Sequence, residues 1–331
     1  MFSYELGVED LADTHFAVSP MHETVLSLRV LRDPGRHALL LPWRRSVVDR
    51  LGDLDVELLL SLVGDRDALP DFLTPRPAVF VPSADEELAR IRATPLPTVR
   101  RDLRAISQSG MSAPPPKRLR RAIEDAGDTA VDELLVTICD TLAAYWHLAI
   151  EPAWPRMRQL LEADMTYRAR RLATGGARLL FGDIHPNVRW RDGVLSISNM
   201  IGNWHASAAG RGLLLMPSVF AHKPAPPVSA AEPPALSYPC RGVATLWSAP
   251  PAIVPDALVA LLGQTRVRLL SLMDEPLPTV ELARRLQVTP SAVSQHLRVM
   301  FATGLVNRAR DGRLVLYRRS PLGDELHDGP R

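Results

Sequence analysis

The chain has 331 residues, 46% of them hydrophobic, and its 39 basic and 37 acidic side chains leave a formal charge of +2. This length and composition predict a globular protein of two domains with sizeable cores. The only two cysteines, Cys139 and Cys240, lie about a hundred residues apart, which excludes a secreted disulfide scaffold. The sequence also shows no signal peptide and no uninterrupted apolar run long enough to span a membrane. We therefore expect a cytoplasmic protein.

The first hundred residues alternate signals for helices and strands. A helix is predicted to begin at residues 19–20, Ser-Pro as N-cap and first residue, and to end at 33–35, Asp-Pro-Gly. Residues 78–81 are predicted as a short strand, and Ser83 and Glu86 have the spacing of a capping box that opens the next helix. The apolar positions that these helices would bury are Met21, Val25, Leu28, Leu31, Leu88 and Ile91.

A break is predicted after this part of the chain. The Pro-rich residues 95–97 and the segment 107–120 indicate a mobile loop or a linker between subdomains. Helical spacing resumes at Arg121, and a further helix over 155–173 is expected to end at Gly175-Gly176.

Strands are predicted late in this region. Residues 188–190 and 194–197 have the pattern of a hairpin around Asp192-Gly193, and further strands are expected at 212–220 and 243–247. The Pro-rich segment 221–239 between these two is interpreted as an exposed loop. Residues 1–252 are therefore expected to form an α+β region.

Residues 253–331 differ from the rest in charge and in pattern. They hold 11 arginines, no lysine and eight acidic residues, and residues 279–320 alone hold eight arginines against Glu281 and Asp311. Such a stretch predicts an anion-binding surface, although it is also compatible with a solvated helix face. Four helices followed by a basic hairpin are predicted, at residues 256–262, 264–273, 279–286, 290–303 and 305–320.

The third and fourth helices have the spacing of a helix-turn-helix. Thr279 is expected to cap the third helix, which would turn Val280, Leu282, Ala283 and Leu286 inward, and Val288 in the turn is expected to be buried. Thr289-Pro290 would begin the fourth helix, burying Val293, Leu297 and either Met300 or Phe301. Its opposite face would expose Ser291, Ala292, Ser294, Gln295 and Arg298.

That exposed face has the chemistry of a DNA recognition helix. Short polar side chains near the N-terminus let the backbone enter a major groove, where Gln295 can form two hydrogen bonds with adenine and Arg298 can bind guanine or a phosphate. In the hairpin, Asp311-Gly312 is the expected turn, and Leu314 and Leu316 are expected to face the core. The arginines expected to line this wing, for phosphates or the minor groove, are Arg308, Arg310, Arg313, Arg318 and Arg319.

The segment TVELARRLQVTPSAVSQHLRVMFATGLVNRARDGRLVLYRRS resembles the ArsR-type winged helix-turn-helix. The resemblance implies that Ser291, Ser294, Gln295 and His296 lie near DNA and that Arg310 and Arg313 contact its backbone, although His296 could instead pack between helices. Since one recognition helix covers only a few base pairs, we expect a homodimer that binds double-stranded DNA at an inverted-repeat operator and acts as a repressor.

The rest of the chain is similar to regulators of high-GC bacteria that carry a long N-terminal domain of uncharacterised function. The segments that carry this similarity include SPMHETVLSLRVLRDPGRHALLLPW, PDFLTPRP and LLEADMTYRARRLATGGARLLFGDIHPNVRW, together with LLLMPSVF and LSYPCRGVATLW. The resemblance covers the chain almost from end to end. It implies no particular ligand.

The sequence departs from the metal-sensing members of the ArsR family. PTVELARRL contains no cysteine, and the final residues offer only Asp324, Glu325, His327 and Asp328, which are interpreted as a frayed polar tail. We therefore expect no metal and no cofactor, and an organic effector or a partner for the N-terminal region. Because the tail is short, dimer contacts are expected from residues 256–273 or from the N-terminal region.

An enzyme domain fused to a DNA-binding module is the alternative. The sequence lacks phosphate-binding, nucleophile-elbow and zinc-protease motifs, so no enzymatic activity is expected. His185 with Asp183 is interpreted as a structural turn rather than a catalytic pair. Trp190, Trp204 and Trp247 are interpreted as core residues rather than as the lining of a ligand pocket.

Overall fold

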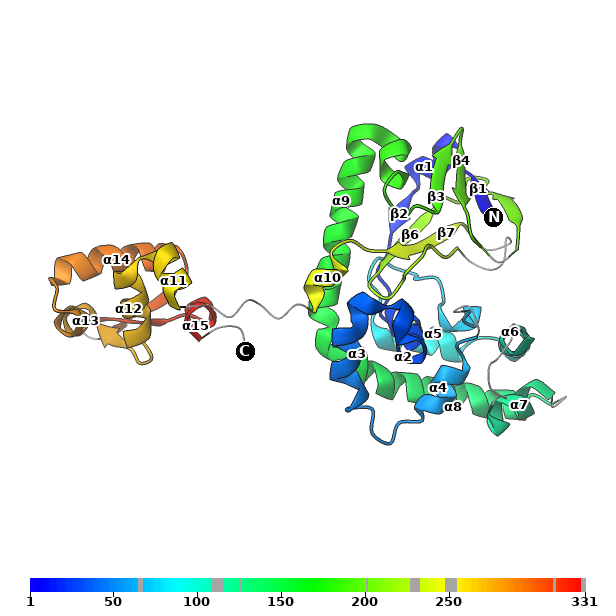
Figure 1. Cartoon of the computed structure of the whole chain (residues 1–331), viewed down its shortest axis with the longest axis horizontal. Coiled ribbons are helices and arrows are strands. Elements are labelled where there is room, and N and C mark those ends of the chain that lie inside the picture. Colours follow the sequence, from blue (N-terminus) through cyan, green and yellow to red (C-terminus); the bar gives the residue numbers. More distant parts are fainter. Residues whose placement is uncertain are drawn as a thin grey trace. The chain divides into compact units, whose positions relative to one another are not determined.

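The computed structural model describes residues 1–64, 68–108, 116–124, 127–200, 202–226, 233–247, 255–311 and 314–328. The chain divides into two compact units, Met1–Trp247 and Ser248–Arg331 (Figure 1). The N-terminal unit contains both helices and sheets, as the α+β prediction required, and the C-terminal unit is a winged helix-turn-helix.

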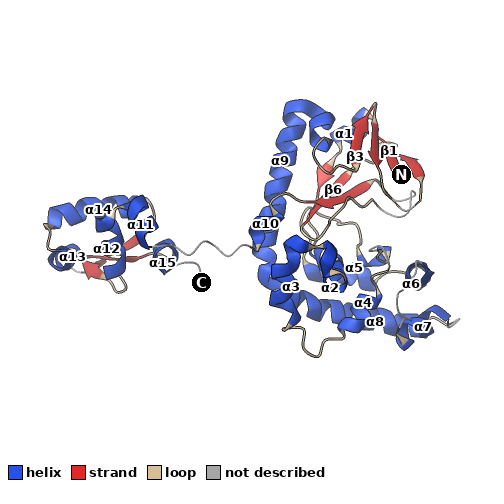
Figure 2. Cartoon of the chain, viewed as in Figure 1, coloured by secondary structure: helices blue, strands red, loops and turns tan. Residues whose placement is uncertain are grey.

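The N-terminal unit has a mostly helical part and a part that contains its strands, beside which α1 (Val8–Ala12) and one end of α9 (Trp154–Phe181) lie (Figure 2). Its other helices are α2 (Pro20–Arg32), α3 (Leu41–Val48), α4 (Val56–Ser61), α5 (Ala84–Arg92), α6 (Leu96–Gln108), α7 (Lys117–Glu124), α8 (Thr129–Tyr145) and α10 (Val243–Leu246). Its strands are β1 (Phe2–Glu5), β2 (His15–Phe16), β3 (Val188–Arg191), β4 (Val194–Ile197), β5 (Trp204–Ser207), β6 (Leu214–Ser218) and β7 (Ala235–Pro239).

The helical part is built around α2, which is buried along most of its length. The predicted cap is confirmed, since the Ser19 side chain accepts a hydrogen bond from the His22 backbone N–H at 2.9 Å and the helix ends at Arg32, before the predicted stop. The capping box of α5 is also confirmed, with both reciprocal bonds between Ser83 and Glu86 present. The first residues of α2 and α5 are therefore determined by capping side chains that lie next to them in the sequence.

Helix α8 is a core helix of this unit. The helical stretch Thr129–Phe181 contains a window apolar enough to cross a membrane by length and composition, and 56% of that window is buried inside the unit. Leu134, Ile138 and Leu142 of α8 lie in the same hydrophobic cluster as Val25 of α2. The apolar character of the stretch is thus accounted for by packing among helices.

The strands form two sheets. In the first, of order β3-β4-β1-β5, β1 pairs antiparallel with β4 and parallel with β5; in the second, β2, β6 and β7 are parallel. The predicted hairpin is confirmed: β3 and β4 are antiparallel, and Asp192 and Gly193 between them have φ of 51° and 80°. Positive φ at both positions is what a two-residue hairpin turn requires.

Several predictions for this unit are wrong. Residues 78–81 form bends rather than a strand, although the Phe80 carbonyl accepts a hydrogen bond from Val18 N–H at 2.9 Å. Residues 235–239, expected within an exposed loop, are the strand β7, which lies beside β6 with Leu236 and Tyr238 fully buried. Residues 243–246, expected as a strand, form the helix α10.

Of the two interpretations of residues 107–120, the linker between subdomains is wrong, whereas the loop is not tested by the described residues. Pro97 lies in the first turn of α6, where a missing N–H costs no hydrogen bond. Leu103 of α6, Leu119 of α7 and Leu142 of α8 share one hydrophobic cluster, so the chain on both sides of 107–120 belongs to one core. Residues 109–115 themselves lie outside the described residues.

Helix α9 joins the helical and the sheet-containing parts. Its first half contributes Met157 and Leu161 to the helical core, and its last turn contributes Leu180 and Phe181 to the core beneath the sheets. The helix is interrupted near its predicted end, where Gly176 has φ of 65°, a backbone conformation that favours glycine.

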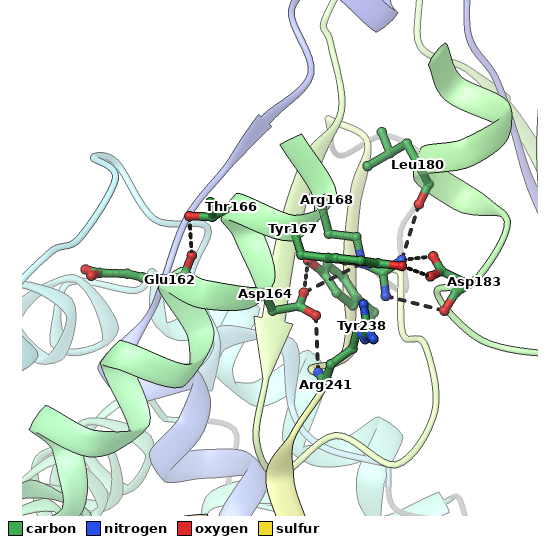
Figure 3. A network of polar contacts seen from close by, with 9 residues as sticks. All are labelled: Glu162, Asp164, Thr166, Tyr167, Arg168, Leu180, Asp183, Tyr238 and Arg241. Carbon is green, nitrogen blue, oxygen red and sulfur yellow. Dashed lines mark hydrogen bonds and ion pairs between the residues drawn. The ribbon is translucent and has the colours of Figure 1, made fainter. Parts of the chain in front are cut away.

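A buried polar network lies on α9 between the two cores (Figure 3). The guanidinium of Arg168, which is fully buried, contacts the carboxylates of Asp164 and Asp183. Asp164 also accepts hydrogen bonds from the Tyr238 hydroxyl at 2.9 Å and from the Arg241 backbone N–H at 3.2 Å. Buried charges are stable only when paired in this way, so the network fixes α9 to β7 and to the turn after α9.

The C-terminal unit consists of α11 (Pro255–Leu262), α12 (Gln264–Leu272), β8 (Leu277–Pro278), α13 (Thr279–Leu286), α14 (Pro290–Ala302), β9 (Val306–Asp311), β10 (Leu314–Arg319) and α15 (Pro321–Asp328). The four predicted helices are confirmed. The wing has one strand more than predicted, because β8 pairs antiparallel with the outer side of the β9-β10 hairpin. The segment interpreted as a frayed tail is instead the helix α15, whose Leu326 packs against the core of the unit.

Candidate nucleic-acid interface

The helix-turn-helix is formed by α13 and α14. Leu282 and Leu286 of α13 and Val293 and Leu297 of α14 lie in one hydrophobic cluster, as predicted. Between the helices, Gln287 has φ of 57° and the backbone N–H of Val288 bonds to the Ala283 carbonyl at 3.1 Å.

Three details of the predicted α13 and its turn are wrong. Thr279 is the first helical residue and makes no side-chain cap bond, because Pro278 occupies the cap position. Val280 is 64% exposed and Val288 is 42% exposed, so neither contributes to the core. Gln287, at the C-cap of α13, has the αL conformation, so the helix ends one residue before Val288.

The predicted start of α14 is confirmed, and so are its faces except at Ala292, which is half-buried rather than exposed. The Thr289 side chain accepts a hydrogen bond from Ala292 N–H at 3.3 Å, and Pro290 is the first helical residue. Met300 is buried on the inner face, whereas Phe301 is 40% exposed, which resolves the alternative between them.

The outer face of α14 carries the polar side chains predicted to read DNA. Ser291, Ser294, Gln295 and Arg298 are exposed, and His296 is half-buried. Positions 291, 294, 295 and 298 follow the spacing of residues that share one face of a helix. The structure thus gathers these four groups on one face, whereas His296 lies off that face, three residues after the buried Val293 and four before the buried Met300.

The arginines predicted to line the wing differ in their exposure to solvent. Arg308 and Arg310 are exposed on β9, and Arg318 is exposed on β10, whereas Arg313 lies outside the described residues together with Gly312 of the predicted turn. In the ladder, Arg308 pairs with Tyr317 and Arg310 with Val315, so these four side chains share one face of the hairpin.

The core-facing residue of β10 is Tyr317 rather than Leu316. Tyr317 packs against the hydrophobic cluster of the unit, and Leu316 is half-buried on the opposite face, beside Pro278 of β8. Because side chains alternate along a strand, a one-residue error in register moves every side chain to the other face. For Leu314 only its place at the start of β10 is described.

Arg319 does not line the wing, contrary to prediction. The residue is 8% exposed, and its guanidinium donates to the Leu270 carbonyl at 2.8 Å and to the Asp324 carboxylate at 2.7 Å, and it also contacts Asp274. It therefore ties β10 to α12 and to α15. No sequence signal near Arg319 distinguishes it from the exposed Arg318, because its partners lie up to 49 residues away in the chain.

A contact between the wing and α14 was not predicted from the sequence. The guanidinium of Arg308 lies 4.4 Å from the centroid of the Phe301 ring, which connects the wing to the end of α14.

The ion pairs within α13 were not predicted either. The Glu281 carboxylate accepts hydrogen bonds from both Arg284 and Arg285 at 2.7 to 2.8 Å. Hydrogen bonds from Arg284 and Arg285 lower the pKa of the Glu281 carboxyl to about 2, so Glu281 is charged and partly neutralises both cations.

The candidate catalytic pair of the N-terminal unit has structural contacts. Asp183 accepts a hydrogen bond from the Tyr167 hydroxyl at 2.6 Å besides its contact with Arg168. His185 Nδ1 accepts from the Asn187 backbone N–H at 3.1 Å, as in a turn. Among the residues that the structure describes, no group of three or more His, Cys, Asp or Glu side chains is placed to hold a metal ion.

The tryptophans considered as pocket residues make packing contacts. Trp190 lies 5.3 Å from Phe181 between ring centroids, and Trp204 stacks on Phe2 at 4.7 Å. Trp247 packs against the helical core.

Residues 263–308 match the family described as bacterial regulatory protein, arsR family. The match begins at the residue before α12 and ends within β9, so it includes both helices of the helix-turn-helix and the start of the wing. No curated protein and no solved structure matches the chain.

Proposed function

We propose that the chain is a homodimeric repressor of the ArsR type, with α14 in the major groove and the wing on the DNA backbone. The match of residues 263–308 to the arsR family supports the DNA binding. The observation that carries this proposal is the shared exposed face of Ser291, Ser294, Gln295 and Arg298, together with the exposed arginines of the wing, which joins the end of α14 through Arg308 and Phe301. Polar groups on a helix read base edges, and arginines on a flanking hairpin bind phosphates.

Selection of bound duplexes from a random pool by the full chain tests this function. A dimer that reads two half-sites should enrich an inverted repeat whose half-site centres lie about 10 base pairs apart. Enrichment of no sequence above the pool, at a salt concentration where the protein still binds, would contradict sequence-specific reading. A reporter gene placed behind the selected site then distinguishes repression from activation.

The homodimer is supported by exposed apolar side chains on the helices that adjoin α12. Leu261 of α11 is 74% exposed and Leu322 of α15 is 47% exposed. Burying such side chains between two copies contributes favourable free energy in proportion to the apolar area removed from water. Light scattering on the DNA complex is expected to give two chains per operator, and a Leu261→Glu variant should give one.

For the N-terminal unit we propose a regulatory role, in the cytoplasm, without catalysis and without a metal. It would bind an organic effector or a partner. The structural contacts of Asp183, His185 and the three tryptophans support this proposal, because they leave those side chains committed to packing and turns. Mass spectrometry of small molecules released from the purified protein tests it, and about one tightly held zinc or copper ion per chain would contradict it.

A further inference from the structure

Helix α7 of the N-terminal unit is the most cationic short helix outside the DNA-binding domain. Its eight residues, Lys117–Glu124, include Lys117, Arg118, Arg120 and Arg121 against the single acid Glu124. All four cations are exposed. The rest of this unit does not share the excess, since residues 1–252 hold nearly equal numbers of basic and acidic side chains.

The fold holds α7 so that one basic face points to solvent. Leu119 and Ala122 are 1% and 0% exposed and pack in the helical core. Arg104 of α6 donates two hydrogen bonds, of 3.2 and 3.0 Å, to the Ile123 carbonyl near the end of α7. The helix is therefore anchored through its apolar side and its C-terminal end, which leaves the opposite side for a partner.

Three of the four cations form one stripe, and Glu124, three residues after Arg121 and four after Arg120, is the acid on the same face. Lys117, Arg120 and Arg121 are separated by three and four residues, so they share a face of the helix. Within the described part of the chain, no carboxylate forms an ion pair with any of the three, whereas Arg118 contacts Asp55 at 3.9 Å. A hollow of about 510 Å³, open to solvent, lies against this stripe and is bordered by Lys117, Arg120, Arg121 and Glu124.

Some other exposed arginines of this unit are paired with acids, whereas Arg178 and Arg189, which are also exposed, stand singly rather than in a stripe. Arg92 contacts Asp140, and Arg158 contacts Glu162 at 2.7 Å. An unpaired stripe of three cations has a mutual repulsion that an anionic partner would relieve. The feature that favours an anionic partner is thus the concentration of three cations on one exposed face of α7, with no ion pair to them among the described residues.

We propose that the Lys117, Arg120 and Arg121 stripe of α7 binds phosphates of the same duplex DNA that the C-terminal unit binds. The three cations lie within about 6 Å of helix length, and duplex DNA carries one charge per about 1.7 Å of its axis, so neighbouring phosphates can neutralise all three. This inference rests on the DNA binding of the proposed function and extends it to the N-terminal unit.

The covalent connection of the two units makes even a weak contact of this kind effective. Once the helix-turn-helix holds a duplex, the local concentration of phosphates at α7 is on the order of millimolar, provided that the connection can span the distance. Non-specific contacts with dissociation constants of about 10⁻⁴ to 10⁻⁶ M are then occupied. The contact adds affinity without reading sequence.

The test is a salt titration of DNA binding by the full chain. A random-sequence duplex of about 60 base pairs is labelled with fluorescein, and binding is measured by anisotropy across a range of KCl concentrations. The variant carries Lys117→Gln, Arg120→Gln and Arg121→Gln. The loss of three phosphate contacts should make the slope of log association constant against log KCl concentration shallower by about 2.7.

Two control variants separate this contact from other effects. Arg178→Gln, Arg189→Gln and Arg191→Gln remove three exposed arginines elsewhere in the same unit and change the net charge equally, so the wild-type slope is expected. Arg120→Lys with Arg121→Lys keeps the charges and should keep the slope. All six tryptophans lie in residues 43–247, so their fluorescence on heating reports whether each variant is folded.

A wild-type slope in a folded glutamine variant would overturn the proposal, whatever else the stripe binds. Failure of the wild-type chain to bind the duplex at low salt would instead contradict the proposed function. The two failures are therefore distinguishable in one series of measurements.

Discussion

The guanidinium of Arg308 lies over the ring of Phe301, with 4.4 Å between its Cζ atom and the ring centroid. Phe301 is the penultimate residue of α14, and Arg308 belongs to β9, so the contact joins the wing to the end of α14. A cation over an aromatic ring at an exposed site contributes about 0.5–1 kcal/mol. The position of Arg308 for a phosphate contact would thus depend on Phe301.

We expect Phe301→Leu to weaken DNA binding by about two- to five-fold, the equivalent of that contact, although Phe301 itself touches no phosphate. Arg308→Ala should weaken binding more, because it removes the charge as well. If Phe301 acts through Arg308, the double variant should bind no worse than Arg308→Ala alone. Anisotropy measurements on one duplex give all four affinities, and additive losses would contradict the coupling.

Arg318 and Arg319 are neighbours in sequence with different roles in the structure. Arg319→Ala should destabilise the C-terminal unit by about 1–3 kcal/mol, because it leaves Asp274, Asp324 and the Leu270 carbonyl without their donor. Arg318→Ala should leave stability nearly unchanged and make the salt slope of DNA binding shallower by about 0.9. Hydrogen exchange of α12 and α14 measures the first effect. Equal protection in both variants would contradict this division.

The helices of the C-terminal unit could be predicted because their signals are local. Thr289-Pro290 begins α14 and the apolar spacing that follows gives its buried face, so no distant residue is needed. The contacts of Arg319 could not be predicted in the same way. They depend on Asp274 and Asp324, which only the folded chain brings to the same point.

The strands of the N-terminal unit show the same limit. β1 pairs with β4 and β5, near positions 194–207, and β7 is recognisable only beside β6, because its burial comes from a parallel neighbour rather than from alternation along its own sequence. The prolines before β7 suggested a loop, and that signal is correct only up to the point where pairing with β6 begins. The hairpin of β3 and β4 was predicted because its turn is local.

Glu281 holds two cations of α13, and we expect its removal to affect DNA binding. Since Glu281 bonds to both Arg284 and Arg285, Glu281→Gln should release two cations at the helix that crosses the DNA backbone in proteins of this type. We expect tighter binding to random duplexes and a steeper salt dependence. Glu325→Gln, an exposed acid on α15, removes the same charge and serves as the control. Equal gains in both variants would mean that only net charge matters.

A buried carboxyl group predicts the pH dependence of the N-terminal unit. Glu23 on α2 is 1% exposed and accepts the Val219 backbone N–H at 3.0 and 3.2 Å. Burial raises the pKa of Glu23 to about 8, against the opposing hydrogen bonds from Ser218, Val219 and Phe220. Because the folded pKa lies above the unfolded value of 4.5, the stability that this group contributes is present below about pH 4.5 and is lost as the pH rises through 8.

The free energy of unfolding of the N-terminal unit should therefore fall between pH 5 and 8, and Glu23→Gln should reduce that slope. Glu87, whose pKa burial raises to about 7, adds a component of the same sign, so the double variant with Glu87→Gln should be the least pH-dependent. Denaturant unfolding followed by tryptophan fluorescence reports this unit alone. A Glu23→Gln protein with the wild-type pH profile would show that Glu23 titrates normally.

Different substitutions in the C-terminal unit should impair the recognition of DNA sequence and the affinity for the DNA backbone. Gln295 is exposed on the outer face of α14, and Arg310 is exposed on the wing. Gln295→Ala should cost about 1–3 kcal/mol on the selected operator and little on random DNA, if it makes a bidentate base contact. Arg310→Ala should weaken binding to both duplexes similarly and make the salt slope shallower by roughly one. Salt-titrated anisotropy on both duplexes measures each quantity. Should Gln295→Ala weaken both equally, Ser291, Ser294 or Arg298 would have to read the sequence, since they share its face of the helix.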